Sequence, residues 1–289
     1  MKKIEMTGVP ETMIQTLYAR AMESEREGHL IYDKKAMEIV KEMDYDFAKA
    51  KEDAMMRNGV VARTIVLDEL VQNYVTAHPN AVVINIACGL DTRFYRVDNG
   101  KLRWFNLDLP VTIEVRKKFL EETGRVSVLP YSAMDEAWAE EVHKTLSEEE
   151  KADKKDKENG KANEKETRPT LVIMEGLTMY LSLEEVRKIF EIIRNHFTDA
   201  TVLVETMSPF VVKHIKEKSI EASKAKFTWG IKNGRTPAKE LPGFEAVKDI
   251  SLVEGMKKLY PVYGIIGKIP AVRNISNQII ELKEVCIRK

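Results

Sequence analysis

The chain has 289 residues, with 46 basic and 46 acidic side chains, so its formal net charge is zero. This balance gives no electrostatic reason to expect nucleic acid or an anionic membrane as a partner. The two cysteines, Cys88 and Cys286, are too widely spaced for a disulfide framework or a metal-binding pair, and they suit a reducing compartment. The N-terminus lacks an apolar signal region and no apolar run could span a bilayer, so we expect a soluble cytoplasmic protein.

The first eighty residues are predicted to form a helical cap. Further helices are expected over 32–43 and 60–78, where apolar residues recur three and four positions apart. The same spacing marks an amphipathic helix near residues 10–24, through Ile14, Leu17, Tyr18 and Ala21.

After residue 80 the pattern becomes an alternation of short apolar runs and helical stretches. This alternation predicts an α/β fold with a mainly parallel sheet and helices on both faces, in a single domain over 1–289. The expected strands lie at 81–87, 103–108, 125–129, 170–174, 201–205 and, at the end, 277–287. The helix over 183–197 is announced by a capping box at Ser182 and Glu185. The mixed segment 208–260 is expected to be an addition beside the sheet.

Residues 147–168 differ from the rest because fifteen of these 22 residues are charged and none is a large apolar residue. Such a segment cannot bury enough surface to offset its ordering entropy, so we expect a solvated, flexible insertion. A partner-binding role is the less common alternative for a charge run.

Small or acidic residues follow four of the predicted strands. In an open parallel sheet, ligands bind outside the carboxyl ends of the strands. Gly89 follows the first strand, and Asp108 ends the second, nineteen residues later, a spacing at which an acid can accept hydrogen bonds from ribose hydroxyls. Met134 and Asp135 follow the third strand and suit the face and amino edge of an adenine. Glu175 follows the fourth.

At any one of these positions, a plain turn is the commoner reason for glycine or aspartate. The stretch after the first strand also lacks G-x-G-x-x-G, which counts against a dinucleotide because its pyrophosphate needs close backbone approach. Together the positions favour a ligand that contains adenosine but no phosphate.

Four blocks resemble the leucine carboxyl methyltransferase family and occur in that family's order. The stretch "INIACGLDTRFYRV" at 84–97 is similar to its signature, close to "VNLGAGLDTRAYRL". "FNLDLPVTIEVRKKFL" at 105–120 and "IMEGLTMYLS" at 173–182 resemble "VDLPEVIERKRRLL" and "AEGVLMYLP". "VVARTIVLDELV" at 60–71 is similar to the arginine-bearing helix that precedes the signature. "DYDFAKAKED" and "FTWGI" resemble the bacterial small-molecule members, which include polyketide-tailoring enzymes.

The resemblance implies a class I, Rossmann-like fold that binds S-adenosylmethionine (SAM) and releases S-adenosylhomocysteine. By position, Arg63 would meet the SAM carboxylate, and Ala87 and Gly89 would form the loop under the methionine part. Asp108 would take the ribose hydroxyls, and Glu175 would face the amino end of the methionine.

The same comparison would place Met134 and Asp135 beside the adenine, and Tyr180 near the methyl acceptor. Arg20 is a weaker candidate for a second contact with the cofactor or the substrate, and the favoured alternative is an exposed arginine on a helix. Ala87 departs from the family, which commonly has glycine there. Alanine fits if its backbone angles are ordinary, whereas a positive φ would put SAM binding in doubt.

Methyl transfer to a carboxylate needs no general base, whereas a phenol or alcohol would benefit from one. No His, Cys or Asp cluster has metal-ligand spacing. His196 is expected to interact with a helix dipole, and His214 could reach an acceptor. Trp229 and Phe227 are more typical of core aromatics than of an acceptor pocket.

Three functions are compatible with the sequence. The first is an O-methyltransferase acting on a carboxylate or hydroxyl of a small molecule. The second methylates a protein carboxyl terminus. The third is a non-catalytic adenosine-binding or interaction protein with the same fold. A narrow acceptor cavity would favour the first over the second. Neither nucleic acid nor a membrane is an expected partner, and no feature indicates an oligomeric state.

Overall fold

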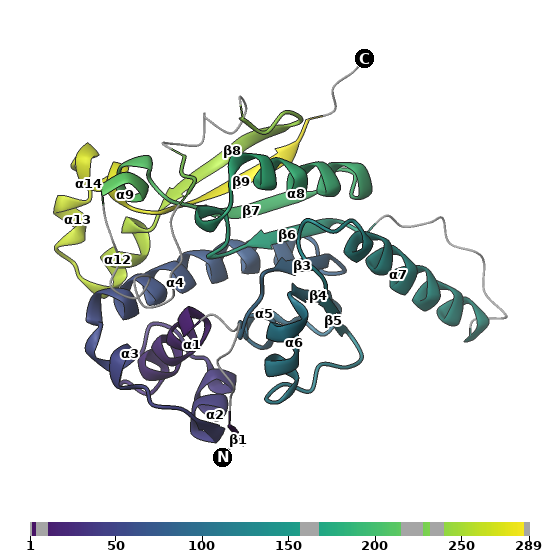
Figure 1. Ribbon diagram of the computed structural model, residues 1–289, viewed down its shortest axis with the longest axis horizontal. Coiled ribbons are helices and arrows are strands. Elements are labelled where there is room, and N and C mark those ends of the chain that lie inside the picture. The colour runs from purple at the N-terminus through teal and green to yellow at the C-terminus, as the bar shows by residue number, and fades with distance from the viewer. Residues whose placement is uncertain (1, 4–10, 157–167, 215–227, 232–239, 286–289) are drawn as a thin grey trace.

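The computed structural model describes residues 2–3, 11–156, 168–214, 228–231 and 240–285 (Figure 1). Its centre is a seven-stranded sheet of order β5-β4-β3-β6-β7-β9-β8, in which β9 runs opposite to the other six strands. The strands are β3 (Val82–Ile86), β4 (Arg103–Asp108), β5 (Val126–Pro130), β6 (Thr170–Met174), β7 (Thr201–Thr206), β8 (Phe244–Ser251) and β9 (Gln278–Glu284). The predicted mainly parallel α/β sheet is therefore confirmed.

Strand order reverses at β3, because the chain runs outward through β4 and β5 and then crosses back to place β6 on the other side of β3. The carboxyl ends of β3 and β6 therefore flank the switch point, where ligands bind in sheets of this kind.

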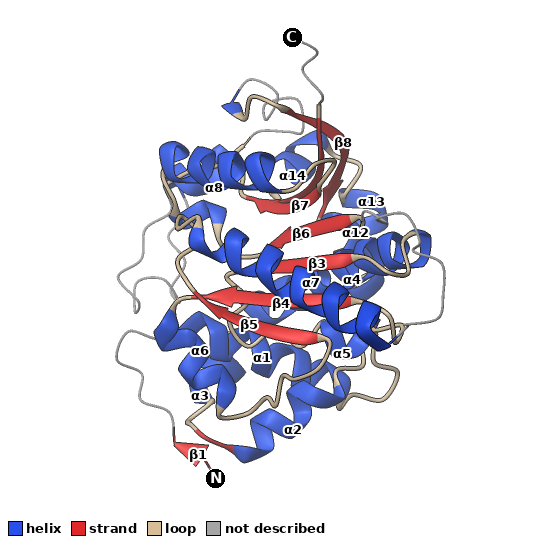
Figure 2. Ribbon diagram, turned by 90° about the vertical axis from the view of Figure 1, so that its right-hand side faces the viewer, coloured by secondary structure: helices blue, strands red, loops and turns tan. Residues whose placement is uncertain are grey.

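Both faces of the sheet are buried, and alternate residues of each central strand serve different faces. Ile84 and Ile86 pack with α7 (Ala137–Asp156) and α8 (Leu183–His196), whereas Val83 packs with α4 (Ala54–Ala77) and α5 (Phe94–Val97). Figure 2 shows α7 on the near side of the sheet and α4 behind it. The capping box predicted for α8 is present, since the side chains of Ser182 and Glu185 each accept the other residue's backbone N–H.

The predicted N-terminal helical cap is present. Its helices are α1 (Glu11–Ser24), α2 (Lys34–Glu42), α3 (Ala48–Glu52) and the long α4, and a two-residue pair joins β1 (Lys2–Lys3) to β2 (Met43–Asp44). Apolar side chains of α1 and α2 pack against Leu90, directly after the β3 turn, and against Val115 in α6 (Pro110–Lys117). The cap therefore covers the carboxyl end of β3.

The charged segment 147–168 begins inside a helix. Residues 147–156 form the second half of α7, which projects from the body of the molecule in Figure 1. Glu149 pairs with Arg103 across 2.6 Å and ties this half to the sheet. Residues 157–167 lie outside the described part.

The prediction that 208–260 lies beside the sheet was incomplete, because β8 within it forms the sheet edge. Charged side chains on this strand hide the strand pattern, and its pairing with β9 shifts register between Ala246 and Lys248. Charges and bulges of this kind are normal for edge strands, which must avoid pairing with other chains. The segment also includes α9 (Pro209–His214) and α12 (Val253–Leu259).

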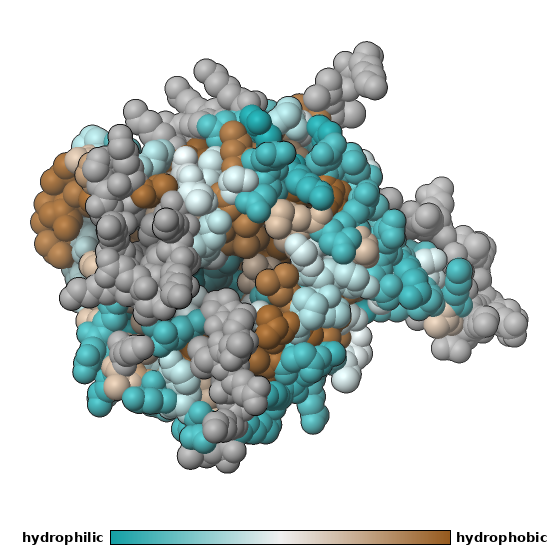
Figure 3. Space-filling view, in the orientation of Figure 1, coloured by the Kyte–Doolittle hydropathy of each residue, from teal (hydrophilic) through white to brown (hydrophobic). Residues whose placement is uncertain are grey.

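Two short helices after α12, and the residues that directly precede them, carry exposed apolar side chains. They are α13 (Tyr263–Ile266) and α14 (Pro270–Ile275), and Val262, Ile265 and Ile269 are each at least half exposed. Figure 3 shows the resulting apolar patch at the left edge of the molecule, where Figure 1 places both helices. None of the described helices is both long and apolar enough to cross a membrane.

Candidate cofactor site

The turn that follows β3 has a left-handed backbone at two positions. Ala87 has φ of 55° and Gly89 has φ of 47°. A Cβ on Gly89 would lie 3.0 Å from Cγ of Met13 in α1, so a side chain here would press against the cap. Glycine is therefore favoured at position 89 both by its backbone angles and by the close approach of Met13.

Asp108 lies at the end of β4 beside this turn. Its Oδ2 accepts the backbone N–H of Gly89 at 2.8 Å, and its Oδ1 accepts the N–H of Leu109 at 2.7 Å. Burial raises the pKa of this carboxyl, while the two N–H groups oppose the rise. The side chain of Thr112 also hydrogen-bonds this carboxylate, which can accept about four hydrogen bonds and so has room for one more donor. The structure thus brings the predicted Gly89 and Asp108 into direct contact.

The predicted Arg63 and Glu175 also meet. Nε of Arg63 lies 2.7 Å from Oε1 of Glu175, and its Nη1 donates to Oε2 of Glu205 at 3.0 Å. Although Nε is buried and close to Glu175, it makes no hydrogen bond of acceptable angle. The backbone N–H of Gly176 donates to the same Glu205 oxygen at 2.8 Å. This guanidinium is held among carboxylates yet retains unused donor capacity.

Glu175 bridges two arginines, because its second oxygen accepts Nη2 of Arg93 at 2.7 Å. Arg93 is 1% exposed and also pairs with Asp68 and Asp91. Burial would raise the pKa of Glu175, but the charges of Arg63 and Arg93 outweigh it and hold that pKa below its ordinary value. Glu175 is therefore ionised inside the molecule.

The ion pairs continue into the N-terminal cap. Asp33 is fully buried and accepts hydrogen bonds from Nε of Arg20 at 3.0 Å and Nη1 of Arg96 at 2.6 Å. Arg20 also donates to the carbonyl of Leu90 at 2.9 Å. The favoured alternative of an exposed Arg20 was wrong: the side chain is only 3% exposed, because α1 lies directly over the turn after β3.

Sequence reasoning missed most of this ion-pair network, which joins four arginines to five carboxylates. Its members are Arg20, Arg63, Arg93, Arg96, Asp33, Asp68, Asp91, Glu175 and Glu205. Three of them belong to the signature residues 91–96, "DTRFYR". The spacing of residues in a sequence does not show, however, that charged side chains after a strand are buried.

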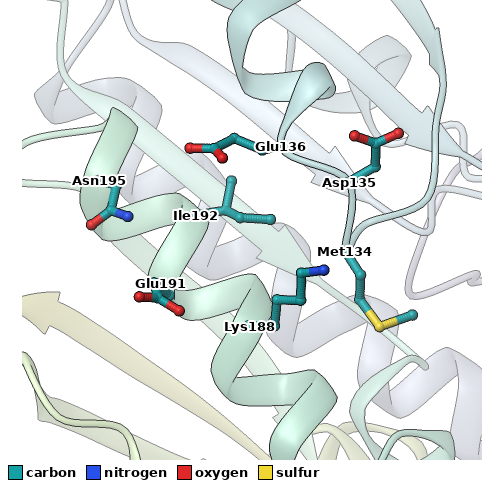
Figure 4. Close-up of a pocket in the computed structure, with 7 residues that line it drawn as sticks. All are labelled: Met134, Asp135, Glu136, Lys188, Glu191, Ile192 and Asn195. Atoms are coloured by element: carbon teal, nitrogen blue, oxygen red, sulfur yellow. The ribbon is translucent and has the colours of Figure 1, made fainter.

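Met134 and Asp135 lie apart from these contacts, in the loop before α7. With Glu136 and four residues of α8, they line a cavity of about 540 Å³. Figure 4 shows their side chains pointing in opposite directions from the loop. Oδ1 of Asp135 accepts the backbone N–H of Ala137 at 3.1 Å, so it also supports the start of the helix.

Tyr180 lies in the 3-10 turn η1 (Thr178–Tyr180) after β6, within electrostatic reach of Arg63. His196 ends α8, as predicted, and its Nε2 lies 2.6 Å from Oε1 of Glu136. Trp229 is buried in the core and donates to Glu240, which confirms the packing role. Phe227 and the side chain of His214 fall outside the described residues.

Across the described ranges, no group of three His, Cys, Asp or Glu side chains is placed to hold a metal ion. A match to the family model for leucine carboxyl methyltransferase covers residues 13–194. The chain belongs to this family. It is accordingly a methyltransferase of the SAM-dependent class.

Two relatives match most of the chain. The tetracenomycin polyketide synthesis O-methyltransferase TcmP of Streptomyces glaucescens is 28% identical over 253 residues, 87% of this chain and 86% of the relative. The S-adenosyl-L-methionine-dependent methyltransferase dpfgK of Gibberella zeae is 27% identical over 265 residues, covering 84% and 82%. A crystal structure of a DUF574 family protein from Streptomyces avermitilis has a TM-score of 0.58 at 13% identity, covering 97% and 99%. Its likeness concerns the fold alone. The family and the mainly parallel seven-stranded sheet together give this chain the class I, Rossmann-like SAM-methyltransferase fold.

The geometry suits the cofactor of this family. SAM carries a carboxylate, an ammonium and a sulfonium, so its net charge is positive, and the ion-pair network has one more carboxylate than it has arginines. The buried Nε of Arg63 has no well-aligned acceptor, and the Asp108 carboxylate can accept a further hydrogen bond beside the left-handed turn at Ala87 and Gly89. Arg63, Asp108 and the turn after β3 therefore fit SAM.

Proposed function

We propose that this chain transfers the methyl group of SAM to a carboxylate or hydroxyl oxygen of a small molecule. The observation that carries the proposal is the contact between Gly89 and Asp108, where a left-handed turn and a carboxylate meet at the ends of adjacent strands. Similarity to a polyketide O-methyltransferase over 87% of the chain supports a small-molecule acceptor. The free, buried thiol of Cys88 suits a reducing compartment, and we propose the cytoplasm.

Each residue has a proposed part in holding SAM. Asp108 accepts the ribose hydroxyls, and the backbone of Ala87 and Gly89 lies under the methionine part. Arg63 turns its unused donors to the cofactor's carboxylate, while Glu175 faces the ammonium. Met134 and Asp135, at the edge of the 540 Å³ cavity, border the adenine.

SAM supplies an activated methyl group on a positively charged sulfur. The protein's task is then to hold the acceptor oxygen in line with that methyl and to exclude water. We propose that Tyr180 positions the acceptor, because it follows Glu175 by five residues and lies near Arg63. A carboxylate acceptor is already ionised and needs no base.

Isothermal titration calorimetry with SAM and S-adenosylhomocysteine tests the cofactor half of the proposal. We expect both to bind, and Asp108→Ala to weaken binding about ten- to a hundredfold, since hydrogen bonds to a charged group contribute about 1.5–3 kcal/mol. Asp98→Ala is the matched control, because Asp98 also accepts a turn N–H, from Gly100, but at the amino end of β4. Equal affinity for SAM in the native protein and Asp108→Ala would refute the ribose assignment.

The acceptor half is tested with methyl-labelled SAM. We expect label in aromatic carboxylates or phenols and none in peptides that end in leucine. Transfer to such a peptide would establish the alternative, a protein carboxyl methyltransferase. Binding of SAM without transfer to any acceptor in either panel would favour the non-catalytic adenosine-binding protein.

A further inference from the structure

The carbonyl of Gly89 is held as firmly as its N–H. Nη1 of Arg116, in the last turn of α6, donates to this carbonyl oxygen at 2.8 Å. Arg116 is 1% exposed and is the only described side chain with a hydrogen bond to this oxygen from a charged nitrogen. The two peptide groups of Gly89 therefore join Asp108 on one side to Arg116 on the other.

Arg116 is itself held by Glu122. Nε donates to Oε2 at 2.7 Å and Nη2 to Oε1 at 2.5 Å, a two-pronged pair in which Glu122 is 2% exposed. Paired contacts of this kind fix the direction of the guanidinium as well as its position. Its remaining nitrogen, Nη1, is thereby aimed at the turn after β3.

Glu122 is anchored in turn by the central strands. Its Oε1 accepts Nδ2 of Asn106 at 2.8 Å, and Oδ1 of Asn106 accepts Nδ2 of Asn85 at 3.3 Å. Asn85 also donates to Asp91 at 3.0 Å, beyond the turn. These polar side chains of β3 and β4 are buried, so the array is rigid rather than a solvated surface contact.

This part of the backbone needs such a support. Both Ala87 and Gly89 are left-handed, and alanine pays a steric penalty in that region, so the turn would relax if its carbonyl were released. Relaxation would change the backbone angles of Gly89 and so turn its N–H away from the Asp108 carboxylate that accepts it.

We propose that Arg116, fixed by Glu122, is a positioning residue that presets the Gly89 turn and, through the Gly89 N–H, the orientation of the Asp108 carboxylate. The proposal rests on the proposed function in one respect, namely that SAM occupies this turn. Arg116 acts through Gly89 and does not itself touch the ligand. Because the turn is already ordered in the folded protein, the free-energy cost of ordering it is not subtracted from the affinity for the cofactor.

The test compares Arg116→Gln, Arg116→Lys and Glu122→Gln with a matched control, Arg103→Gln. Arg103 is also buried, on β4, and also pairs with a glutamate and donates to a backbone carbonyl, but it lies at the opposite end of the strand. Three quantities are measured for each folded variant: affinity for S-adenosylhomocysteine, melting temperature, and amide hydrogen exchange of peptides spanning 86–91 without ligand.

We expect all four variants to melt earlier. Arg116→Gln should weaken S-adenosylhomocysteine binding by about tenfold or more and speed exchange at 86–91, whereas Arg103→Gln should keep both within about twofold of native. Arg116→Lys and Glu122→Gln should show losses between those of Arg116→Gln and Arg103→Gln. Lysine can reach the Gly89 carbonyl or Glu122 but cannot make both contacts, and glutamine at 122 keeps the contact with Arg116 without its charge. If Arg116→Gln does not fold, these two variants carry the comparison against Arg103→Gln.

Native affinity together with native exchange in the Arg116 and Glu122 variants would overturn the proposal. So would an equal loss of affinity in Arg103→Gln, which would mean that lower stability alone weakens binding. If the native protein does not bind S-adenosylhomocysteine, the proposed function fails separately. Exchange at 86–91 then still decides whether Arg116 holds the turn.

Discussion

Ala87 shows how one side chain stores strain beside the candidate site. With φ of 55° its Cβ crowds the backbone, a conformation that glycine adopts freely and that costs other residues about 1–2 kcal/mol. The sequence showed only that alanine stands where the family commonly has glycine. The condition set for an easy fit, ordinary backbone angles, is not met.

Replacing Ala87 with glycine should therefore stabilise the protein, by about 0.5–1 kcal/mol after the added freedom of the unfolded chain is subtracted. Urea unfolding monitored by tryptophan fluorescence measures the change. Ala81→Gly is the control, since Ala81 is buried just before β3 without a positive φ, and it should lose stability. A loss in Ala87→Gly as large as that in Ala81→Gly would show that the turn is not strained.

At the scale of elements, two helices of the cap both begin with an aspartate N-cap, but only one of these aspartates makes further contacts. Asp33 and Asp53 each accept the N–H three residues on at 2.9 Å, at the starts of α2 and α4. Asp33 additionally holds Arg20, Arg96 and the hydroxyl of Thr92. It thereby ties α1 and α2 to the segment after β3.

Asp33→Ala should cost about 3–5 kcal/mol of unfolding free energy, because it strips two buried arginines of a partner. Asp53→Ala should cost only about 1 kcal/mol, the typical value for a lost N-cap. Denaturant unfolding of both variants measures the difference, and similar losses would show that Asp33 acts as a helix cap alone.

The whole ion-pair network makes stability depend on pH. Burial opposes ionisation of Asp33, Asp91 and Glu175, but neighbouring arginines outweigh it and lower the pKa of each from ordinary values of 3.8, 3.8 and 4.5. Their contribution is thus present above those values and is lost as pH falls below about 4.5 through the folded pKa values. Asp108, whose pKa is raised, contributes with the opposite sign.

We therefore expect the unfolding free energy to fall steeply as the pH drops below about 4.5. The fall should be smaller in Glu175→Gln, which removes one carboxyl group whose pKa is lowered in the folded protein. Urea titrations from about pH 7 downward measure both profiles. A flat native profile would show that these carboxylates are not held ionised by arginine.

The C-terminal part and the cap are joined where α12 crosses α4. A Cβ on Gly255 would lie 2.1 Å from the carbonyl oxygen of Ala62, next to Arg63, so the helices meet backbone to backbone. Gly255→Ala should separate them and cost about 1–3 kcal/mol or more. Gly264→Ala, in α13 with open space around it, should be neutral or stabilising. Thermal unfolding compares them, and an equally mild Gly255→Ala would argue against this close crossing.

The sequence anticipated what depends on local pattern. Apolar periodicity located the central strands and the cap helices, the capping box marked the start of α8, and ordered motifs indicated the family. It missed β8, because an edge strand carries charges that mask alternation, and it missed Glu205 and Asp33, because burial of a charge depends on partners brought in from elsewhere.

By itself, the sequence determined the class of fold and which residues follow each strand, since side-chain periodicity and turn chemistry are properties of neighbouring residues. Only the tertiary structure decided that Arg20 is buried, that Arg63 meets Glu175 and that Arg116 holds the carbonyl of Gly89. The last two contacts join residues 112 and 27 positions apart. They form because the sheet order brings the ends of β3, β4 and β6 together, where buried charges are stable only when paired.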